Sequence, residues 1–296
     1  MTSTCVGRAL AKSAVLRPVS ETARLDTELL LLRVIGGTRA DLHSRPERVL
    51  SARQEFAFEQ LLARRLQGEP VAYILGWKGF WDMELAVDPR VLIPRPETEL
   101  LVEIVLELYA ERCDEPLQVA DFGTGSGAIA LALARENPAW RIIATDVSRE
   151  ALAVAQHNAA AMKVSNVHFV QASWCKGLSN AAFDLIVSNP PYIKISDPHL
   201  RQLRFEPRDA LAAGSDGLQD IRQLVRQSRR VLKRGGWLLM EHGYDQQQAV
   251  ADLVQAGRYD SVQNWRDLAG HARVTGARWE QAASEAEAGA KEPDDE

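Results

Sequence analysis

A glycine-rich segment near the middle of the chain has the composition of a ligand-binding turn. The segment Gly123-Thr124-Gly125-Ser126-Gly127 follows a short apolar run and precedes a stretch rich in Ala and Leu. Glycines let the backbone turn sharply and approach a ligand closely, because no Cβ intervenes. Asp146 ends the next apolar run, where a carboxylate accepts hydrogen bonds from ribose hydroxyls in nucleoside-binding α/β folds. The pattern therefore predicts a cofactor that contains a nucleoside.

Two cofactors fit this pattern, and the acid before the glycines favours one of them. Gly123, Gly125 and Ala128 also match the degenerate G-x-G-x-x-G/A pattern of NAD-binding proteins. S-adenosyl-L-methionine has a ribose and an adenine but no pyrophosphate. Asp121 would repel a pyrophosphate, whereas it could receive the amino group of a methionine moiety. We therefore favour S-adenosyl-L-methionine over NAD, and a turn without a ligand is the third interpretation.

A second element that could do chemistry is Asn189-Pro190-Pro191-Tyr192, which follows a later apolar run. Two prolines remove two backbone donors, so that neighbouring carbonyls are free to accept hydrogen bonds. Asn189 adds an amide oxygen, and Tyr192 adds a flat aromatic face. These groups suit a planar NH2 group, whose hydrogens the Asn189 side chain and the Pro190 carbonyl would accept. Positioning its nitrogen beside an electrophilic methyl group can lower the barrier by roughly 7–11 kcal/mol. Taken alone, the element could equally be a Pro-rich exit from a strand.

Alternating strands and helices are expected to position both elements. Five apolar runs have strand length: Leu117–Ala120, Arg141–Thr145, Val167–Val170, Phe183–Ser188 and Trp237–Glu241. Helical stretches separate most of them, which indicates a parallel sheet covered on both faces. Ser261–Leu268 and Arg273–Trp279 are predicted to form an antiparallel hairpin at the sheet edge. The predicted fold class is therefore α/β, with a doubly wound, mostly parallel seven-stranded sheet.

A small helical domain and a β-hairpin are predicted before this sheet. The leucines Leu25, Leu29 and Leu32 recur at helical spacing and are expected to face a core. Alternation from Trp81 to Val87 and the apolar run Val91–Ile93 predict the two strands of the hairpin. The predicted divisions are a helical domain at 1–75, a hairpin linker at 76–95, a catalytic domain at 96–280 and a disordered acidic tail at 281–296.

Composition excludes several classes of protein. The 296 residues carry 35 basic and 40 acidic side chains, and this net charge of −5 disfavours a protein that coats nucleic acid. Cys5, Cys113 and Cys175 lie far apart, which argues against a disulfide scaffold or a zinc ribbon. The six histidines show no ligand spacing, so no metal is expected. No signal peptide or membrane span is predicted, and a cytoplasmic protein is expected.

The order and content of these motifs resemble the S-adenosylmethionine-dependent methyltransferases that modify planar amino nitrogens. Among them, the chain is similar to the release-factor glutamine methyltransferases (PrmC/HemK) over about residues 20–279. Besides the glycine loop and Asn189–Tyr192, the matching stretches are Gly68–Gly76, Leu92–Glu99, Arg204–Arg208, Glu241–Gly243, Asp267–Gly270 and Arg273–Thr275.

This resemblance implies methylation of the glutamine side-chain amide in the Gly-Gly-Gln loop of class I peptide chain release factors. It implies that Gly123–Gly127 packs against the methionine part of S-adenosyl-L-methionine, that Asp146 holds the ribose and that Trp174 lies by the adenine. Asn189–Tyr192 would grip the glutamine amide, with Asn189 also at the cofactor. The helical domain would recognise the substrate of a monomeric enzyme.

Three other functions stay open at this point. The first is the same chemistry on a glutamine of a ribosomal protein, and the second is N6-adenine or N4-cytosine methylation of a nucleic acid. Action on duplex DNA requires base flipping and usually a basic recognition region, so no direct DNA binding is expected here. The third is a non-catalytic adenosyl-binding module. Arg95, Arg204 and Arg208 are candidates for contact with a release factor, with a surface or structural role as the alternative.

Overall fold

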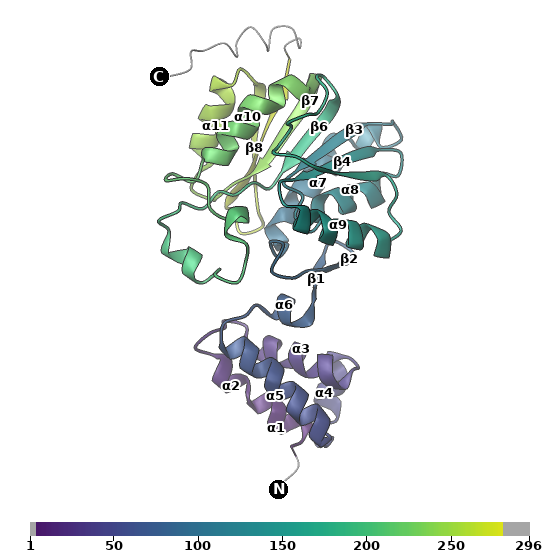
Figure 1. Cartoon of the computed structure of the whole chain (residues 1–296), viewed down its shortest axis with the longest axis vertical. Helices are drawn as coiled ribbons and strands as arrows, with labels where there is room; N and C mark the ends of the chain where they lie inside the picture. The colour runs from purple at the N-terminus through teal and green to yellow at the C-terminus, as the bar shows by residue number, and fades with distance from the viewer. Residues whose placement is uncertain (1–3, 281–296) are drawn as a thin grey trace. The chain divides into compact units, whose positions relative to one another are not determined.

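A computed structural model of the protein describes residues 4–280 (Figure 1). Contacts between residues divide the chain into two compact units, and the boundary in the sequence lies between Trp77 and Lys78. The predicted acidic tail, residues 281–296, lies outside the described residues. Within the described part of the chain, no helix has both the length and the apolar character needed to cross a membrane.

The first unit is helical over its described residues, as predicted. Its helices are α1 (Val6–Ala11), α2 (Ser13–Leu16), α3 (Ala23–Ile35), α4 (Arg39–Ser44), α5 (Ala52–Leu66) and α6 (Val71–Leu75). Leu30 and Leu31 of α3 pack with Phe58 and Leu62 of α5 in one core. Of the predicted stripe, Leu32 packs against this core, whereas Leu25 is exposed, and the buried face is rotated toward Leu30.

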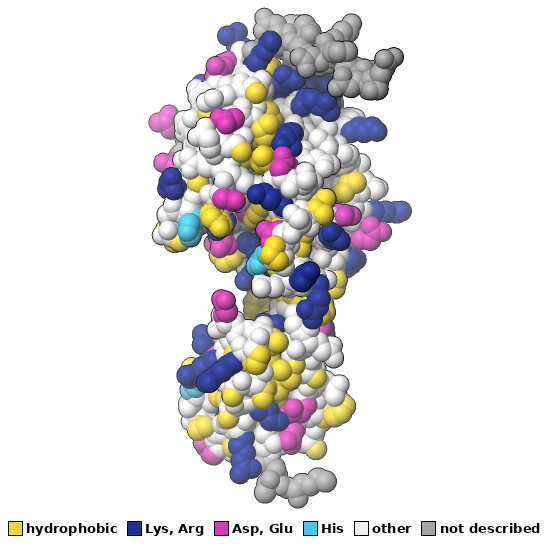
Figure 2. All heavy atoms as spheres, turned by 90° about the vertical axis from the view of Figure 1, so that its left-hand side faces the viewer, with side chains coloured by type: hydrophobic (Ala, Val, Ile, Leu, Met, Phe, Trp, Pro, Cys, Tyr) yellow, Lys and Arg dark blue, Asp and Glu magenta, His cyan; other side chains and the backbone are white. Residues whose placement is uncertain are grey.

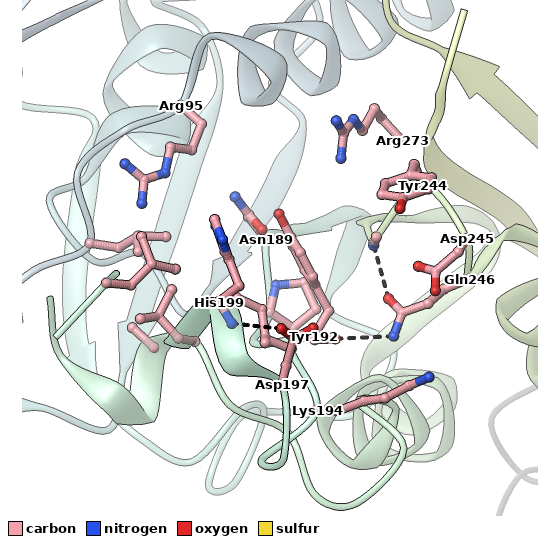
Figure 3. A pocket seen from close by; sticks show the side chains of 17 residues that line it. Arg95, Asn189, Tyr192, Lys194, Asp197, His199, Tyr244, Asp245, Gln246 and Arg273 are labelled. Carbon is pink, nitrogen blue, oxygen red and sulfur yellow. Dashed lines mark hydrogen bonds between the residues drawn. The ribbon is translucent and has the colours of Figure 1, made fainter. Parts of the chain in front are cut away.

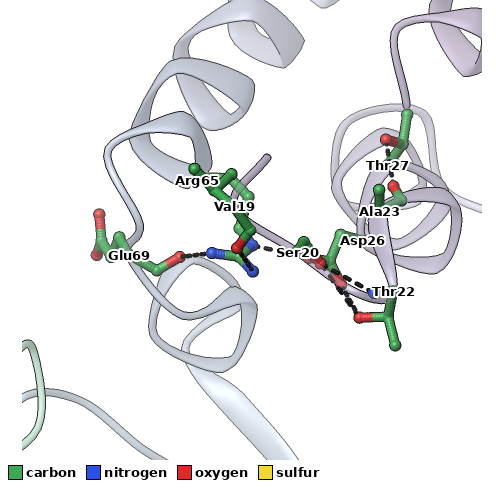
Figure 4. A network of polar contacts seen from close by, with 8 residues as sticks. All are labelled: Val19, Ser20, Thr22, Ala23, Asp26, Thr27, Arg65 and Glu69. Carbon is green, nitrogen blue, oxygen red and sulfur yellow. Dashed lines mark hydrogen bonds and ion pairs between the residues drawn. The ribbon is translucent and has the colours of Figure 1, made fainter. Parts of the chain in front are cut away.

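A buried carboxylate explains why α3 turns a different face inward. Asp26 is 5% exposed and accepts hydrogen bonds from the hydroxyls of Ser20 (2.7 Å) and Thr22 (2.9 Å). It also accepts one from Nε of Arg65 on α5 at 2.7 Å, and Arg65 donates to the carbonyl of Val19 as well (Figure 4). A buried charge with this many partners is compensated, so α3 can bury it together with its leucines.

The second unit contains a seven-stranded sheet in the order β5-β4-β3-β6-β7-β9-β8 (Figure 1). Its strands are β3 (Gln118–Phe122), β4 (Arg141–Asp146), β5 (Val167–Gln171), β6 (Phe183–Ser188), β7 (Leu232–Glu241), β8 (Asp260–Arg266) and β9 (Ala272–Trp279). The neighbouring pairs β5–β4, β4–β3, β3–β6 and β6–β7 are parallel, whereas β9 runs antiparallel to both β7 and β8. The predicted mostly parallel sheet with an antiparallel edge hairpin is confirmed.

Neighbouring residues of each strand point to opposite faces of this sheet, and helices cover both faces. They are α7 (Glu99–Leu108), α8 (Ala128–Glu136), α9 (Arg149–Ala161), α10 (Gln219–Val231) and α11 (Gln247–Ala256), with short 3-10 turns at Pro96–Thr98, Ala110–Arg112, Pro198–Arg201 and Arg208–Ala210. Val119 lies in the core that includes α7 and α8, while Ala120 and Phe122 lie in the core that includes α10 and α11. The sheet is therefore the middle of three layers.

The β-hairpin lies earlier in the chain than predicted. Its strands are β1 (Trp77–Phe80) and β2 (Met83–Ala86), and Trp81 stands in the turn between them with a φ of 56°. The predicted return strand at Val91–Ile93 is wrong, since that stretch forms no strand. Instead, the Ile93 N–H donates to the buried carboxylate of Glu206 at 3.1 Å. A side chain far away in sequence thus satisfies the backbone group that a neighbouring strand would have satisfied.

Candidate functional site

The strand order brings the two predicted chemical elements together. β3 lies between β4 and β6, so the chain crosses from one side of β3 to the other and opens a crevice at the carboxyl ends of the strands. The glycine loop follows β3, and the Asn-Pro-Pro-Tyr element follows β6. At the ends of these two strands, Phe122 pairs with Ser188, whose hydroxyl donates to the Phe122 carbonyl at 2.6 Å. The two elements therefore start side by side.

The glycine loop needs its glycines for conformation and for space. Gly123, Gly125 and Gly127 have φ values of 75°, 55° and 86°, a region that other residues rarely adopt. A Cβ on Gly123 would lie 3.4 Å from the ring of Trp174, and a Cβ on Gly127 would lie 3.0 Å from Leu131. A Cβ on Gly125 would meet nothing within 4 Å. The loop is thus closely packed at both ends and open in the middle.

Asp146 supports this loop from the end of β4. Its Oδ2 accepts from the Gly125 N–H at 2.9 Å, and its Oδ1 accepts from the Ser148 N–H at 2.9 Å. Burial raises the pKa of the carboxyl, although these backbone bonds oppose the rise. Each carboxylate oxygen can accept a further bond, so Asp146 has capacity left for ribose hydroxyls.

Asp121 at the end of β3 is a buried acid with one oxygen unused. Its Oδ2 accepts from the Thr124 hydroxyl (2.7 Å) and the Ala130 N–H (3.2 Å), while its Oδ1 is buried without a partner. Burial raises the pKa of Asp121 to about 7, against the lowering effect of these two bonds. An unpaired buried carboxylate is costly, and a cation beside Oδ1 would offset that cost. The site therefore fits the ammonium group of a methionine moiety.

The structure brings the sequence-predicted cofactor residues to one place. Thr124 and Ser126 are buried within the loop, and Trp174 lies half-buried against Gly123. The backbone of Trp174 is held by the Thr145 hydroxyl, which donates to its carbonyl at 3.2 Å. An open loop, an acid at the end of β4 and an indole ring can together hold an adenosyl group.

The Asn-Pro-Pro-Tyr element is fixed by side chains from other parts of the chain. Nδ2 of Asn189 donates one hydrogen bond to Oγ1 of Thr98 at 3.0 Å, and the carbonyl oxygen of Asn189 is available to accept from a ligand. The Tyr192 hydroxyl donates to Oε1 of Glu241 at 3.4 Å, and the Tyr192 carbonyl accepts from Nε2 of Gln246 at 3.0 Å. Burial raises the pKa of Tyr192, so the phenol keeps its proton and can serve as a donor.

Sequence reasoning missed Thr98, Glu241 and Gln246 as contributors to the site. Glu241 ends β7, is 1% exposed and has one buried oxygen, Oε2, without a partner. Burial raises the pKa of Glu241 to about 7, although the nearby Thr98 hydroxyl and Arg273 guanidinium oppose the rise. An acid at the end of an apolar strand is the signal that singled out Asp121 and Asp146, and the same signal would have found Glu241.

A pocket of about 600 Å³ opens beside Asn189 (Figure 3). Arg95 and Arg273 lie on opposite sides of Asn189 in this view and are held by Glu206 (2.5 Å) and Asp267 (2.9 Å) respectively. Of the three arginines predicted to contact a partner, Arg95 lines the pocket, whereas Arg204 and Arg208 do not. The volume is in the range of sites that enclose a ligand. A side chain could therefore enter the pocket and reach Asn189.

The chemistry available at this site comes from hydrogen-bond acceptors, an aromatic face and buried acids. Within residues 4–280, no three His, Cys, Asp or Glu side chains come together in a group that could hold a metal ion. A group of hydrogen-bond acceptors beside the crevice at the glycine loop suits transfer of a group to a nitrogen that carries two hydrogens.

Comparison with known proteins gives matches over most of the chain. A family model for the PrmC N-terminal domain matches residues 11–76, and one for the methyltransferase small domain matches residues 97–202. Three curated relatives carry the name release factor glutamine methyltransferase. The Coxiella burnetii protein is 50% identical over 266 residues, which is 90% of this chain and 95% of the relative. The Pseudomonas aeruginosa protein is 49% identical (94% and 99% covered), and the Escherichia coli protein is 44% identical (88% and 94% covered).

Solved structures share the fold of the second unit. A methyltransferase from Pyrococcus furiosus is 18% identical and has a TM-score of 0.50, with 75% of this chain and 100% of that chain covered. A 16S rRNA methyltransferase from T. thermophilus, in complex with AdoMet and guanosine, is 20% identical with a TM-score of 0.50, with 68% of this chain and 49% of that chain covered. At such low identity, these likenesses concern the fold alone.

Proposed function

This chain belongs to the release factor glutamine methyltransferase family, and from that premise we propose that it methylates the glutamine of the Gly-Gly-Gln motif in class I peptide chain release factors. It is an S-adenosylmethionine-dependent enzyme that modifies the side-chain amide nitrogen of a protein glutamine. The observation that supports the proposal is the amide of Asn189, which lines the pocket and whose Nδ2 donates to Thr98, so that its oxygen is available as an acceptor.

The glycine loop and its neighbours would hold the cofactor. S-adenosyl-L-methionine, when bound, supplies an electrophilic methyl group on a sulfonium. Gly123–Gly127 would line its methionine part, and the unpartnered oxygen of Asp121 would accept its ammonium group. Asp146 would accept the ribose hydroxyls, and the indole of Trp174 would lie along the adenine. Each assignment uses an acceptor or an open space that the fold leaves available.

The Asn-Pro-Pro-Tyr element would hold the glutamine amide. Oδ1 of Asn189 and the carbonyl of Pro190 would each accept one of the two amide hydrogens, and the Tyr192 ring would cover the amide plane. Holding both hydrogens fixes the direction of the nitrogen lone pair, which is otherwise delocalised into the carbonyl. Pro191 has no N–H, so it adds no donor that would compete for these acceptors. The residues thus act by orientation, an effect that can supply roughly 7–11 kcal/mol.

The finer assignments extend this proposal. We propose that residues 1–75 recognise the release factor, that residues 96–280 carry the methyltransferase, and that the enzyme is a monomer that does not bind DNA directly. On the face in Figure 2, basic and acidic side chains alternate rather than forming a continuous basic surface, which is in keeping with a protein substrate. The cytoplasm, where peptide chains are released from ribosomes, is the proposed compartment. Light scattering after size exclusion tests the monomer.

The substrate is tested by a methyl-transfer assay with labelled S-adenosyl-L-methionine. A release factor, its Gly-Gly-Gln→Gly-Gly-Ala variant, ribosomal proteins and duplex DNA are offered in parallel. We expect label on the release factor that disappears in the Ala variant. Label on a ribosomal protein or on DNA instead would contradict the proposed substrate.

A further inference from the structure

Gln246, the residue before α11, binds the backbone of three separate segments beside the pocket (Figure 3). Its Oε1 accepts from the Gly243 N–H at 2.9 Å, in the segment that follows β7. Its Nε2 donates to the carbonyl of Tyr192 at 3.0 Å and to the carbonyl of Gly217 at 3.3 Å. Gln246 is 7% exposed, so water offers its amide few alternative partners. Both ends of the amide are therefore used within the protein.

The chemistry of these partners determines the orientation of the Gln246 amide. A backbone N–H can only donate, so the atom beside the N–H of Gly243 must be the amide oxygen. Backbone carbonyls can only accept, so the group beside Tyr192 and Gly217 must be the NH2. A flipped amide would lose all three bonds, and no protonation state enters the assignment.

The close approach of these segments depends on Gly217. Its φ of 77° lies in the left-handed region that favours glycine. A Cβ at this position would lie 2.4 Å from the carbonyl oxygen of Tyr192 and 2.8 Å from Nε2 of Gln246. Both distances are too short for a side chain, so the glycine makes room for one NH2 group to reach two carbonyls.

Tyr192 and Gly217 stand at the two ends of a long loop, residues 193–216, between β6 and α10. This loop forms one wall of the pocket, to which Ile193 and Leu211 contribute. The Ile193 N–H donates to the carbonyl of Leu211 at 2.9 Å, so the two arms of the loop lie side by side. The NH2 group of the Gln246 amide therefore joins the loop at both of its ends.

Resting on the proposed function, we infer that Gln246 is a positioning residue that holds Tyr192 and the loop 193–216 in the arrangement that receives the substrate glutamine. The bond to the Tyr192 carbonyl fixes the last residue of the Asn-Pro-Pro-Tyr element. The bond to the Gly217 carbonyl fixes the point at which the pocket wall ends. This action passes through backbone groups and requires no bond to the substrate.

The arrangement can be measured without substrate, by hydrogen exchange of backbone amides. Gln246→Met keeps the length of the side chain and removes its three hydrogen bonds. We expect the amides of Ile193 and Ala213, whose bonds join the two arms of the loop, to exchange at least tenfold faster in this variant. The amide of Gly123, at the end of β3, should exchange as in the wild type. Unchanged exchange in the loop 193–216, or an equal increase at Gly123, would overturn the inference.

A carboxyl group at this position gives a second test, because its proton decides whether it can replace the amide. In Gln246→Glu, the protonated acid can accept from Gly243 and donate to Tyr192, whereas the ionised acid can donate to neither carbonyl. Burial against two carbonyls raises the pKa of such an acid. With saturating S-adenosyl-L-methionine, we expect the kcat of Gln246→Glu to be about 30-fold below the wild type at pH 8.5 and within about threefold of it at pH 6. Gln246→Met should be low at both pH values.

The comparison with the wild type removes the effect of other titrations. The charged and titratable side chains of the pocket are the same in the variant and the wild type: Arg95, Lys194, Asp197, His199, Asp245 and Arg273. Their effects, and those of the buried acids Asp121 and Glu241, cancel in the ratio of the two kcat values. A ratio for Gln246→Glu that does not rise as the pH falls would overturn the inference.

Gln248→Glu is the matched control, because Gln248 is exposed on α11 and bonds only the side chain of Asp252, at 2.8 Å. It should keep the wild-type kcat at both pH values, and a loss like that of Gln246→Glu would overturn the inference. A wild-type enzyme that labels no release factor would count against the proposed function instead. The hydrogen exchange of the loop 193–216 would still decide whether Gln246 holds it.

Discussion

The two units of the molecule treat their buried carboxylates in opposite ways. In the first unit, Glu28 is fully buried and accepts from Nε of Arg24 (3.2 Å) and from Arg39 (2.7 Å), with His43 Nε2 also 3.2 Å away. Burial alone would raise its pKa, but the two arginines more than reverse this and the pKa is lowered. Asp26, in the same helix, is equally well supplied with donors.

In the second unit, Asp121 and Glu241 are just as buried, but each keeps one oxygen without a partner. Burial raises the pKa of each to about 7. The difference teaches that burial of an acid does not by itself mark a functional site. A carboxylate whose bonds are all made contributes to holding helices together, whereas one with an unused oxygen has binding capacity left for another molecule.

The largest effect is expected at Asn189, which the second unit holds in place through the hydroxyl oxygen of Thr98. Asn189→Ala should lower kcat by about 10²–10³, as when one preorganised hydrogen-bonding group is removed from an active site. Affinity for S-adenosyl-L-methionine, measured by calorimetry, should change far less. Turnover near the wild-type value would remove Asn189 from the mechanism.

The contrasting effect in the first unit is on stability. Asp26→Asn leaves the partly buried guanidinium of Arg65 without its charge partner, and breaking a buried ion pair typically costs about 3 kcal/mol. We expect urea unfolding, followed by circular dichroism, to show a loss of this order. The kcat of the protein that remains folded should be unchanged, and a variant with normal stability but reduced kcat would contradict the comparison.

Asp121→Asn should have the reverse effect: ligand binding should weaken, and the stability of the ligand-free protein should not fall. Loss of a charged partner for the ammonium group should weaken binding of S-adenosyl-L-methionine by about 10- to 100-fold. Because the folded-state pKa lies above the ordinary value, the ionised acid destabilises the ligand-free protein as pH rises from about 4 through about 7. At pH 8 the ligand-free Asn variant should therefore melt no lower than the wild type, and a clearly lower melting temperature would show that Asp121 is chiefly structural.

The smallest expected effect is a pH dependence of cofactor binding. A bound ammonium group favours the ionised form of Asp121, so the wild-type affinity should increase as the carboxyl loses its proton. Because that pKa is about 7, we expect a rise of roughly tenfold between pH 6 and 7.5, where the amino group of the ligand stays largely protonated. Calorimetry at several pH values measures it, and the slope should be absent in Asp121→Asn.

Most of the second unit could be predicted from the sequence because its signals are local. The strand at Phe183–Ser188 lies where its apolar run predicted it, and the loop with Gly123, Gly125 and Gly127 joins a strand to a helix as expected. The strand order then follows from connection rules, and it brings Asn189 beside the loop. The site was therefore largely accessible to reasoning about motifs and their order.

The errors arose where a distant side chain decides the local structure. Hydropathy placed Leu25 in the core, but Arg65 makes it possible for α3 to bury Asp26 instead. The run Val91–Ile93 has the composition of a strand, yet Glu206, distant in sequence, binds its backbone. Thr98 lies in the matching stretch Leu92–Glu99, but its role was missed because its partner, Asn189, is 91 positions away in the sequence.

The two hydrogen bonds that fix Asn189 and Tyr192, to Thr98 and Glu241 respectively, also have a consequence for how the protein acquires its activity. Thr98 and Asn189 are 91 positions apart, and Tyr192 and Glu241 are separated by 49. Contacts between such distant segments form slowly, because the entropy of closing a long loop is lost before the contacts can stabilise the fold. The glycine loop and Asp146 can assemble as soon as β3 and β4 pair, whereas the amide site requires the chain through β7. During synthesis, the enzyme should therefore gain cofactor binding before it gains the ability to methylate.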